Sequence, residues 1–187
     1  MTNDVSQLRE QRLPETLEVL FTGRILRLER YSVRQYSGRI AKREVVRHPG
    51  GACVVAVDED MCVTLVRQWR TPMDEVTLEI PAGKLDEGEG DPLACAHREL
   101  REETGLRAAH FELLTQMYTS PGYSDERLYI YLATDLSQGE DDPDEGEMIA
   151  PQRMPLKEAA GMVMRGQLPD SKTALGLMMA AAKLGQL

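Results

Sequence analysis

The sequence predicts an α/β fold with a small antiparallel β extension at its N-terminal end. Residues 16–47 carry short alternations of apolar and polar residues, which are typical of half-buried strands. The rest of the chain mixes near-continuous apolar strands with three helical patterns, as in a layered α/β domain. The chain has 187 residues and 42% hydrophobic content, enough for one globular domain and an appendage. We therefore expect the extension over residues 1–48 and the domain over residues 49–187.

The composition narrows the classes of function. A net charge of −9 argues against a surface built for nucleic-acid phosphates and suits a protein that handles anionic small molecules through metal ions. Cys53, Cys62 and Cys95 lie far apart in apolar company, so we expect reduced, buried thiols. No apolar run approaches the roughly 20 residues of a membrane span, and the N-terminus lacks a signal-peptide core. These observations favour a cytoplasmic protein that binds neither nucleic acid nor membrane.

The N-terminal extension divides into an arm and three strands. Met1–Pro14 is polar and charged, and we expect it to be a loose arm. Alternation begins at Leu17–Phe21, continues over residues 25–33 after the turn at Gly23, and ends with a third strand at Lys42–Arg47. Such a sheet buries little by itself, so it must pack on the main domain or on a second subunit.

The domain begins with a central hairpin. Cys53–Val57 and Cys62–Val66 are apolar runs joined by a short acidic turn. Val76–Ile80 is a short strand that leads into the turn Pro81-Ala82-Gly83. The acidic segment Gln138–Glu147 cannot form a core, so we expect a mobile loop there. The remaining predicted elements are strands at Leu113–Tyr118 and Leu128–Leu132, the start of a last strand at Met148, and helices at Pro155–Arg165 and Asp170–Leu184.

A helix over residues 92–104 is predicted from its two ends. Asp91 is a good N-cap, Pro92 suits the first helical position, and Gly105 suits the C-terminal end. One side of this helix carries an apolar stripe that would face a sheet, and the stripe consists of Leu93, Ala96 or His97, and Leu100.

Three carboxylates share another face of the same helix. Glu99, Glu102 and Glu103 stand at i, i+3 and i+4, where like charges destabilise a helix. A solvated face is the commoner explanation of such a cluster, but the turn that ends at Gly83 can bring backbone carbonyls close to a cation bound there. Oxygen ligands favour Mg²⁺ or Mn²⁺. Arg98, at i, i+4 with Glu102, is predicted to orient that carboxylate.

These residues resemble the Nudix box, Gly-x5-Glu-x7-Arg-Glu-U-x-Glu-Glu-x-Gly-U with U apolar. Gly83 and Glu89 have the spacing of its first part, and Arg98–Leu106 matches its last part throughout. Eight residues lie between Glu89 and Arg98, where the pattern has seven. The extra residue falls in the Gly90-Asp91-Pro92 turn, where a loop absorbs it more easily than a helix does. It leaves the role of Glu89 open.

Further segments are similar to the ADP-ribose pyrophosphatase branch of the Nudix hydrolases. They are Gly23–Leu26, Val66–Arg70, Glu79–Gly83 and Ser120–Glu126, with Pro121 about fifteen residues past the box as in that branch. The resemblance implies an α/β/α sandwich with a mixed sheet. It also implies a homodimer whose N-terminal sheets exchange between subunits, which would explain the extension.

The implied activity is hydrolysis of the diphosphate of a nucleoside diphosphate sugar, with ADP-ribose giving AMP and ribose 5-phosphate. Two or three Mg²⁺ or Mn²⁺ ions would neutralise the diphosphate and lower the pKa of the attacking water. The ligands that the resemblance implies are Glu99, Glu102, Glu103 and the carbonyl of Ala82.

The resemblance places the general base in the acidic loop. Asp144-Glu145-Gly146-Glu147 is similar to the Asp-Glu-x-Glu pattern of that branch. We assign Glu145 as the base, with Glu147 as the alternative or as a further metal ligand. A base on a mobile loop is reasonable because loop closure can assemble a site around bound substrate.

Substrate recognition is assigned to residues around the box. Arg70 resembles the arginine that grips the diphosphate or the terminal ribose, and its planar fork suits phosphate oxygens. Glu79 is predicted to accept hydrogen bonds from sugar hydroxyls. Pro121 and Gly122 complete the predicted substrate site, and Glu126 is a further candidate. The open candidates for base stacking are Tyr31, Tyr36 and Trp69.

Two other functions fit parts of the sequence. A hydrolase of another nucleotide sugar, such as GDP-mannose, would share every catalytic residue and differ only in its pocket. Nudix-fold domains that sense ADP-ribose-like ligands form a non-enzymatic class, usually with an added DNA-binding part and a damaged box. In this chain the glutamates of the box are all present, which favours an enzyme.

Overall fold

The protein forms two compact units. The computed structural model describes residues 5–86, 90–139 and 148–187. The first unit contains the residues up to Pro49 together with Tyr118–Glu126, and the second contains Gly50–Met117 and Arg127–Leu187. A segment from the middle of the chain therefore belongs to the N-terminal unit.

The first unit is built on a three-stranded antiparallel sheet. A short 3-10 helix, η1 (Val5–Leu8), precedes the strands β1 (Gln11–Thr22), β2 (Arg27–Arg34) and β3 (Ile40–Arg47), which lie in the order β1-β2-β3. The prediction of a loose arm up to Pro14 is wrong from Gln11 onward, because Gln11–Leu13 pair with Ser32–Arg34. This part of β1 is largely exposed, so its sequence carries no apolar face that would reveal a strand.

The end of β3 holds the segment Tyr118–Glu126. The Val46 N–H donates to the Tyr123 carbonyl (2.7 Å), and the Asp125 N–H donates to the Val46 carbonyl (3.2 Å). The Asp125 carboxylate also accepts from Arg47 Nη1 (2.8 Å). This segment contains the predicted substrate residues Pro121, Gly122 and Glu126.

The second unit contains a seven-stranded mixed sheet. Its strands are β4 (Gly51–Val57), β5 (Cys62–Arg70), β6 (Glu75–Glu79), β7 (Ala82–Lys84), β8 (Leu106–Tyr118), β9 (Arg127–Gln138) and β10 (Ala150–Pro155). The continuous order is β10-β5-β4-β9-β8, with β6 paired to β5 and β7 paired to β4. Strand β4 runs parallel to β9 and antiparallel to β5 and β7, which makes the sheet mixed.

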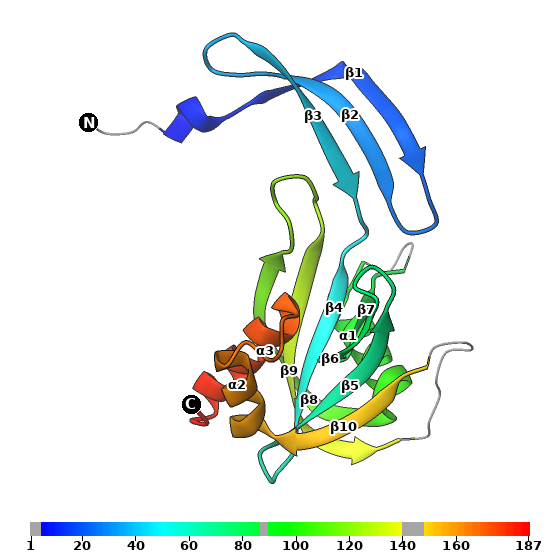
Figure 1. Ribbon diagram of the computed structural model, residues 1–187, viewed down its shortest axis with the longest axis vertical. Helices are drawn as coiled ribbons and strands as arrows, with labels where there is room; N and C mark the ends of the chain where they lie inside the picture. Colours follow the sequence, from blue (N-terminus) through cyan, green and yellow to red (C-terminus); the bar gives the residue numbers. More distant parts are fainter. Residues whose placement is uncertain (1–4, 87–89, 140–147) are drawn as a thin grey trace. The chain divides into compact units, whose positions relative to one another are not determined.

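Helices cover both faces of this sheet. Helix α1 (Pro92–Thr104) lies on one face, and α2 (Leu156–Met164) and α3 (Ser171–Lys183) lie on the other (Figure 1). Strand β4 is buried along its whole length, and its side chains alternate between the faces. Cys53, Val55 and Val57 join the core under α2 and α3, whereas Val54 and Ala56 join the core under α1. The predicted α/β/α sandwich with a mixed sheet and a small antiparallel extension is confirmed.

Both ends of α1 lie where the sequence predicts them. The Asp91 side chain accepts a hydrogen bond from the Leu93 N–H (2.9 Å), and Pro92 opens the helix. Gly105 has a φ of 69°, a left-handed conformation that suits glycine, and its N–H donates to the Arg101 carbonyl. These local signals fix the rotation of the helix, and its side toward the sheet consists of Leu93, Cys95, Ala96 and Leu100.

Several strands differ from their predicted bounds. Strands β8 and β9 are longer than predicted, and β10 begins at Ala150 rather than at Met148. The predicted turn at Pro81-Ala82-Gly83 contains the short strand β7, because Ala82 and Gly83 pair with Cys53 and Ala52 of β4. Strand β7 thereby ties the start of the glycine-rich segment to the centre of the sheet.

The three cysteines are free thiols, as predicted. Cys53 and Cys95 are buried, and Cys62 is only partly buried. Burial raises the pKa of Cys53 to about 12, so this thiol stays protonated at neutral pH. In the parts of the chain that the structure describes, no helix is long and apolar enough to cross a membrane.

Candidate active site

Two of the three predicted metal-ligating glutamates are buried. Glu99 is 8% exposed and Glu103 is 7% exposed, whereas Glu102 is partly buried. Carboxylates are rarely buried unless they are paired. The face of α1 that carries these three side chains is therefore not a simple solvated surface. We call Glu99, Glu102 and Glu103 the carboxylate face.

The backbone of β7 approaches this face very closely at Gly83. A β-carbon added to Gly83 would lie 1.9 Å from Glu99 Oε1, well inside van der Waals contact. The absence of a side chain at this position therefore lets the Glu99 carboxylate rest against the backbone. The Ala82 N–H donates to Glu103 Oε2 (2.9 Å), which attaches a second carboxylate of the face to the same strand.

Arg98 connects two carboxylates of the face. Its Nη1 donates to Glu102 Oε2 (3.0 Å), the contact that the sequence predicts, and also to Glu99 Oε1 (2.6 Å). Its Nη2 donates to the Lys84 carbonyl (3.1 Å). Burial lowers the pKa of Arg98, but Glu99 and Glu102 outweigh this effect and raise the pKa above its ordinary value. Arg98 thus stays charged and holds both carboxylates in place.

The donor types of the carboxylate face fit a hard divalent cation. The three carboxylates offer only oxygen atoms as ligands, which Mg²⁺ and Mn²⁺ prefer. Within residues 5–86, 90–139 and 148–187, no three His, Cys, Asp or Glu side chains already stand together as a metal site. The fit of a divalent cation to the carboxylate face therefore rests on the type of the donor atoms and on the close approach at Gly83. Arg98 neutralises part of the negative charge of the face.

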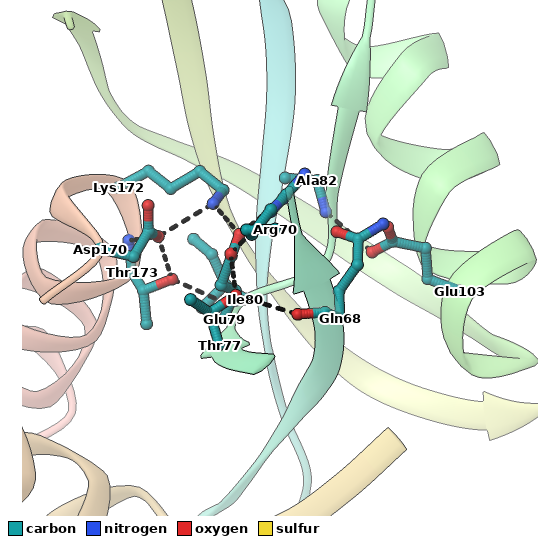
Figure 2. Close-up of polar contacts among 10 residues, drawn as sticks. All are labelled: Gln68, Arg70, Thr77, Glu79, Ile80, Ala82, Glu103, Asp170, Lys172 and Thr173. Atoms are coloured by element: carbon teal, nitrogen blue, oxygen red, sulfur yellow. Dashed lines mark hydrogen bonds and ion pairs between the residues drawn. The ribbon is translucent and has the colours of Figure 1, made fainter. Parts of the chain in front are cut away.

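A second charged cluster lies at the end of β6 (Figure 2). Arg70 donates to Glu79 from Nε (2.8 Å, to Oε1) and from Nη2 (2.7 Å, to Oε2). Thr77 Oγ1 donates to Glu79 Oε1 (2.5 Å), and Lys172 Nζ donates to Glu79 Oε2. Burial raises the pKa of Glu79, but Arg70 and Lys172 outweigh it and lower the pKa to about 2. We call Arg70, Glu79, Lys172 and Asp170 the Arg70 cluster.

The four donors occupy the acceptor positions of the Glu79 carboxylate. A carboxylate has about four lone-pair positions, two on each oxygen. Each Glu79 oxygen already accepts two hydrogen bonds from the protein. A sugar hydroxyl that donated to Glu79, as the sequence predicts, would have to displace one of these donors.

Sequence reasoning missed the part of the Arg70 cluster that comes from α3. Lys172 is 9% exposed and also donates to Asp170 Oδ2 (2.9 Å). The available signal was a lysine and an aspartate at the start of a helix that is otherwise rich in Ala, Leu and Met. Gln68, two residues before Arg70 on β5, is joined to the cluster through its backbone carbonyl, which lies 3.2 Å from Thr77 Oγ1 (Figure 2).

The remaining predicted site residues lie in the first unit or outside the described residues. Pro121, Gly122 and Glu126 belong to the first unit, where Glu126 accepts from Thr119 Oγ1 (2.6 Å) and pairs with His48 Nδ1 (3.2 Å). Their contribution to a substrate site stays a prediction. Glu89, Glu145 and Glu147 lie outside the described residues.

Comparison with known proteins defines the class. The family model of the NUDIX domain matches residues 47–174, which is more than half of the chain. The chain therefore belongs to the Nudix family, as the box and the carboxylate face indicate.

Individual relatives refine this assignment. The chain is 38% identical to the ADP-ribose pyrophosphatase of Bacillus subtilis (strain 168) over 86% of its own length and 87% of that protein. It is also 38% identical to the methanol dehydrogenase activator of Bacillus methanolicus, over 92% and 94% of the two chains. The crystal structure of an ADP compounds hydrolase has the same fold, with a TM-score of 0.81, 22% identity, and coverage of 96% of this chain and 97% of that one.

Proposed function

We propose that the protein hydrolyses the diphosphate of ADP-ribose to AMP and ribose 5-phosphate, with Mg²⁺ or Mn²⁺ as the cofactor. The observation that carries this proposal is the carboxylate face, gathered on α1 against the backbone of Gly83. The Bacillus subtilis relative, whose name is ADP-ribose pyrophosphatase, supports the choice of substrate. The name of the Bacillus methanolicus relative describes an effect on another enzyme and states no reaction of its own.

In this proposal the carboxylate face holds the metal ions. Glu99, Glu102, Glu103 and the Ala82 carbonyl are the ligands, and Arg98 orients Glu102 and Glu99. When bound, two or three divalent ions would neutralise the diphosphate and lower the pKa of the attacking water. The chain itself contributes the fixed position of the carboxylates, since a preorganised site spends no energy on reorganisation during the reaction.

Arg70 is the proposed contact to the substrate diphosphate. A guanidinium forms paired, charge-assisted hydrogen bonds with phosphate oxygens. Glu79 holds Arg70 through Nε and Nη2. Within the described parts of the chain, no protein group pairs with Nη1 of Arg70, so this nitrogen is available for an anion. Because the acceptor positions of Glu79 are filled, we propose that it acts on the substrate through Arg70.

The proposed general base is Glu145, with Glu147 as the alternative. Removing a general base typically costs about 10²–10⁴-fold in rate. Glu145→Gln is therefore expected to lower kcat by that order with little change in KM. Glu147→Gln is the competing variant, and Glu140→Gln in the same acidic segment is the matched control. A larger loss of kcat in Glu147→Gln would reverse the assignment.

We also propose a homodimer that is joined through the first unit. Its sheet exposes several large apolar side chains, which soluble monomers rarely gather in one place. They include Val19 (52% exposed) and Phe21 (56%) of β1, and Ile25 (53%) follows in the connection between β1 and β2. Light scattering is expected to give twice the chain mass of 21.0 kDa. The double variant Val19→Asp, Phe21→Asp is expected to give a monomer. A cytoplasmic location stays a prediction.

A substrate panel tests the proposed function. The protein is incubated with Mg²⁺ and ADP-ribose, GDP-mannose, other nucleotide sugars and dinucleotides, and the products are separated. We expect ADP-ribose to react fastest, to give AMP and ribose 5-phosphate, and to stop reacting when EDTA is added. Faster hydrolysis of GDP-mannose would favour a different nucleotide-sugar hydrolase. Tight binding of ADP-ribose without turnover would favour the ligand sensor.

A further inference from the structure

The first turn of α3 grips the end of β6 at two adjacent residues. Lys172 Nζ donates to the Glu79 carboxylate, and Thr173 Oγ1 accepts a hydrogen bond from the Ile80 N–H (2.9 Å). Figure 2 shows these contacts side by side, with α3 on one flank of β6. The contacts join residues 93 positions apart in sequence, and they add polar bonds to the apolar packing between α3 and the end of β6.

Asp170 organises this grip. Its Oδ2 accepts hydrogen bonds from Lys172 Nζ (2.9 Å), Thr173 N–H (3.0 Å) and Thr173 Oγ1 (2.5 Å). Asp170 is the N-cap of α3, so the same carboxylate starts the helix and aims the two side chains that reach β6. A change of rotamer at Lys172 or Thr173 would break one of these bonds.

The Arg70 cluster is balanced in charge and graded in exposure. It contains two cations, Arg70 and Lys172, and two carboxylates, Glu79 and Asp170. Glu79 is 3% exposed, whereas the Arg70 side chain is 38% exposed. Breaking a buried ion pair from one side leaves an uncompensated charge, so the buried half of such a cluster is rigid.

The exposed half of the cluster faces open space. Arg70 borders a cavity of about 480 Å³, which is also lined by Met73, Glu75, Pro169 and Ser171. Because Glu79 binds Arg70 side-on through Nε and Nη2, the plane of the guanidinium is fixed and its Nη1 edge is left to a ligand. The direction of that edge depends on where Glu79 is held.

We propose that Lys172 is a positioning residue that sets the orientation of Arg70 for the substrate diphosphate by holding Glu79. This inference rests on the proposed function, because it takes Arg70 as the diphosphate contact. Lys172 anchors Glu79 Oε2, the oxygen that also accepts from Arg70 Nη2, and Asp170 anchors Lys172. Without the ammonium, Glu79 and Arg70 are free to rotate together about their own side-chain torsions.

The kinetic test compares Lys172→Met with Lys183→Met. Lys183 lies on the same helix but is 44% exposed and pairs with the exposed Glu112. For ADP-ribose with Mg²⁺, Lys172→Met is expected to raise KM about tenfold, with kcat within about threefold of wild type. Lys183→Met is expected to leave both constants unchanged. Lys172→Arg, which keeps the charge, is expected to have a KM much closer to that of wild type.

A double-mutant cycle separates positioning from general damage. In an Arg70→Ala background, Lys172 has no guanidinium left to position, so Lys172→Met is expected to leave KM as it is in Arg70→Ala alone. An equal rise of KM in both backgrounds would overturn the proposal. If Lys172→Met does not fold, Lys172→Gln replaces it, because its amide keeps a donor near Glu79 without the charge. We expect a smaller rise of KM in Lys172→Gln, and again no further rise in the Arg70→Ala background.

A spectroscopic test does not depend on turnover. The Nε–Hε cross-peak of Arg70 in ¹⁵N-labelled protein, assigned by its loss in Arg70→Lys, reports the hydrogen bond to Glu79. In Lys172→Met it is expected to shift and to exchange faster with solvent, whereas Lys183→Met leaves it in place. An unmoved cross-peak in Lys172→Met would overturn the proposal. A wild-type protein that does not hydrolyse ADP-ribose would contradict the proposed function, and the cross-peak would then decide the inference.

Discussion

The carboxylate face and the Arg70 cluster lie close together in the same unit and are built in opposite ways. The face brings three carboxylates together, with Arg98 and Arg101 as the cations that the described residues place against them. The Arg70 cluster has two carboxylates and two cations, and each oxygen of Glu79 already accepts two hydrogen bonds. The carboxylate face thus has an excess of negative charge. The Arg70 cluster is balanced in charge and the acceptor positions of Glu79 are filled, and in this sense it is closed.

The difference assigns different tasks to the two clusters. Excess carboxylate, held against a backbone without a side chain, is an arrangement that a divalent cation stabilises. A closed cluster gains nothing from a cation, but it holds its exposed member in one orientation. The proposed metal site and the proposed contact of Arg70 with the diphosphate thus follow from charge balance. Substitutions in the carboxylate face should therefore lower the rate of catalysis. Substitutions in the Arg70 cluster should instead change the orientation of Arg70 or the stability of the protein.

The largest expected effect is at Glu103, in the carboxylate face. Glu103→Gln keeps an oxygen for the Ala82 N–H but removes the negative charge that a metal ligand needs. We expect kcat with ADP-ribose to fall by about 10²–10⁴-fold, since metal ions supply several kcal/mol to such reactions. Steady-state kinetics at saturating Mg²⁺ measures the loss.

The control for Glu103 is Glu158→Gln, an exposed glutamate in the first turn of α2. It should leave kcat unchanged. A ligand that binds the folded state raises Tm, so Mg²⁺ is expected to raise the Tm of wild type and of Glu158→Gln but less that of Glu103→Gln. If Glu103→Gln had the kcat and the Mg²⁺-dependent rise in Tm of wild type, the assignment of the metal to the carboxylate face would be wrong.

The next effect concerns the stability of the closed cluster. Glu79→Gln leaves Arg70 and Lys172 without their shared anion, which costs on the order of 3 kcal/mol for a buried pair. The pKa of Glu79 is about 2 in the folded protein, below its ordinary value of 4.5. Its stabilisation is therefore complete above about pH 4.5 and is lost as the pH falls to about 2.

The measurement is the difference in Tm between wild type and Glu79→Gln as a function of pH. We expect the difference to be largest above pH 4.5 and to shrink toward pH 2, because wild-type Glu79 is protonated only there. Glu75→Gln, at the exposed start of the same strand, is the control. A difference that stays constant over this range would show that Glu79 stabilises the fold by something other than its charge.

A smaller effect tests the close approach between β7 and α1. A β-carbon at Gly83 would collide with the Glu99 carboxylate, which lies at the end of a flexible side chain and can move away. Gly83→Ala is therefore expected to fold normally while kcat falls about 10–100-fold, the usual cost of disturbing metal ligands. Gly90→Ala is the control, since a β-carbon there meets no atom of the described residues within 4 Å. Equal kinetics in the two variants would contradict the importance of the approach.

The carboxylate face could be predicted because its signals are local. Asp91, Pro92 and Gly105 mark the ends of α1 within one stretch of sequence, and the helical period then places the three glutamates on one side. The strand pattern likewise reveals β4, whose apolar run is buried on both faces. Short-range rules were sufficient for these features.

The Arg70 cluster could not be predicted because its contacts are not local. Lys172 reaches Glu79 across 93 positions of sequence, and no periodic pattern records which helix packs on which strand. Glu79 therefore looked available to a sugar, although its acceptor positions are filled by protein donors. The prediction also failed at the start of β1, because an exposed strand has no alternation of apolar residues that would reveal it.

The smallest expected effect concerns Thr173, the uncharged residue of the two that connect α3 to the end of β6. Thr173→Val has nearly the same shape but removes the acceptor for the Ile80 N–H and the hydroxyl that donates to Asp170 Oδ2. We expect a loss of about 1–3 kcal/mol, the cost of leaving a buried polar group unpaired, seen as a fall in Tm of about 2–4 °C for each kcal/mol in a chain of this size. The charges of the Arg70 cluster remain, so KM for ADP-ribose should change less than in Lys172→Met.

Ser171→Ala, an exposed position in the same turn, is the control for the stability effect of Thr173→Val and should leave Tm unchanged. The comparison between Thr173→Val and Lys172→Met then separates two ways in which α3 can act on β6. A rise in KM that is as large in Thr173→Val as in Lys172→Met would mean that α3 positions Arg70 through the backbone at Ile80. The ion pair between Lys172 and Glu79 would then contribute only to stability.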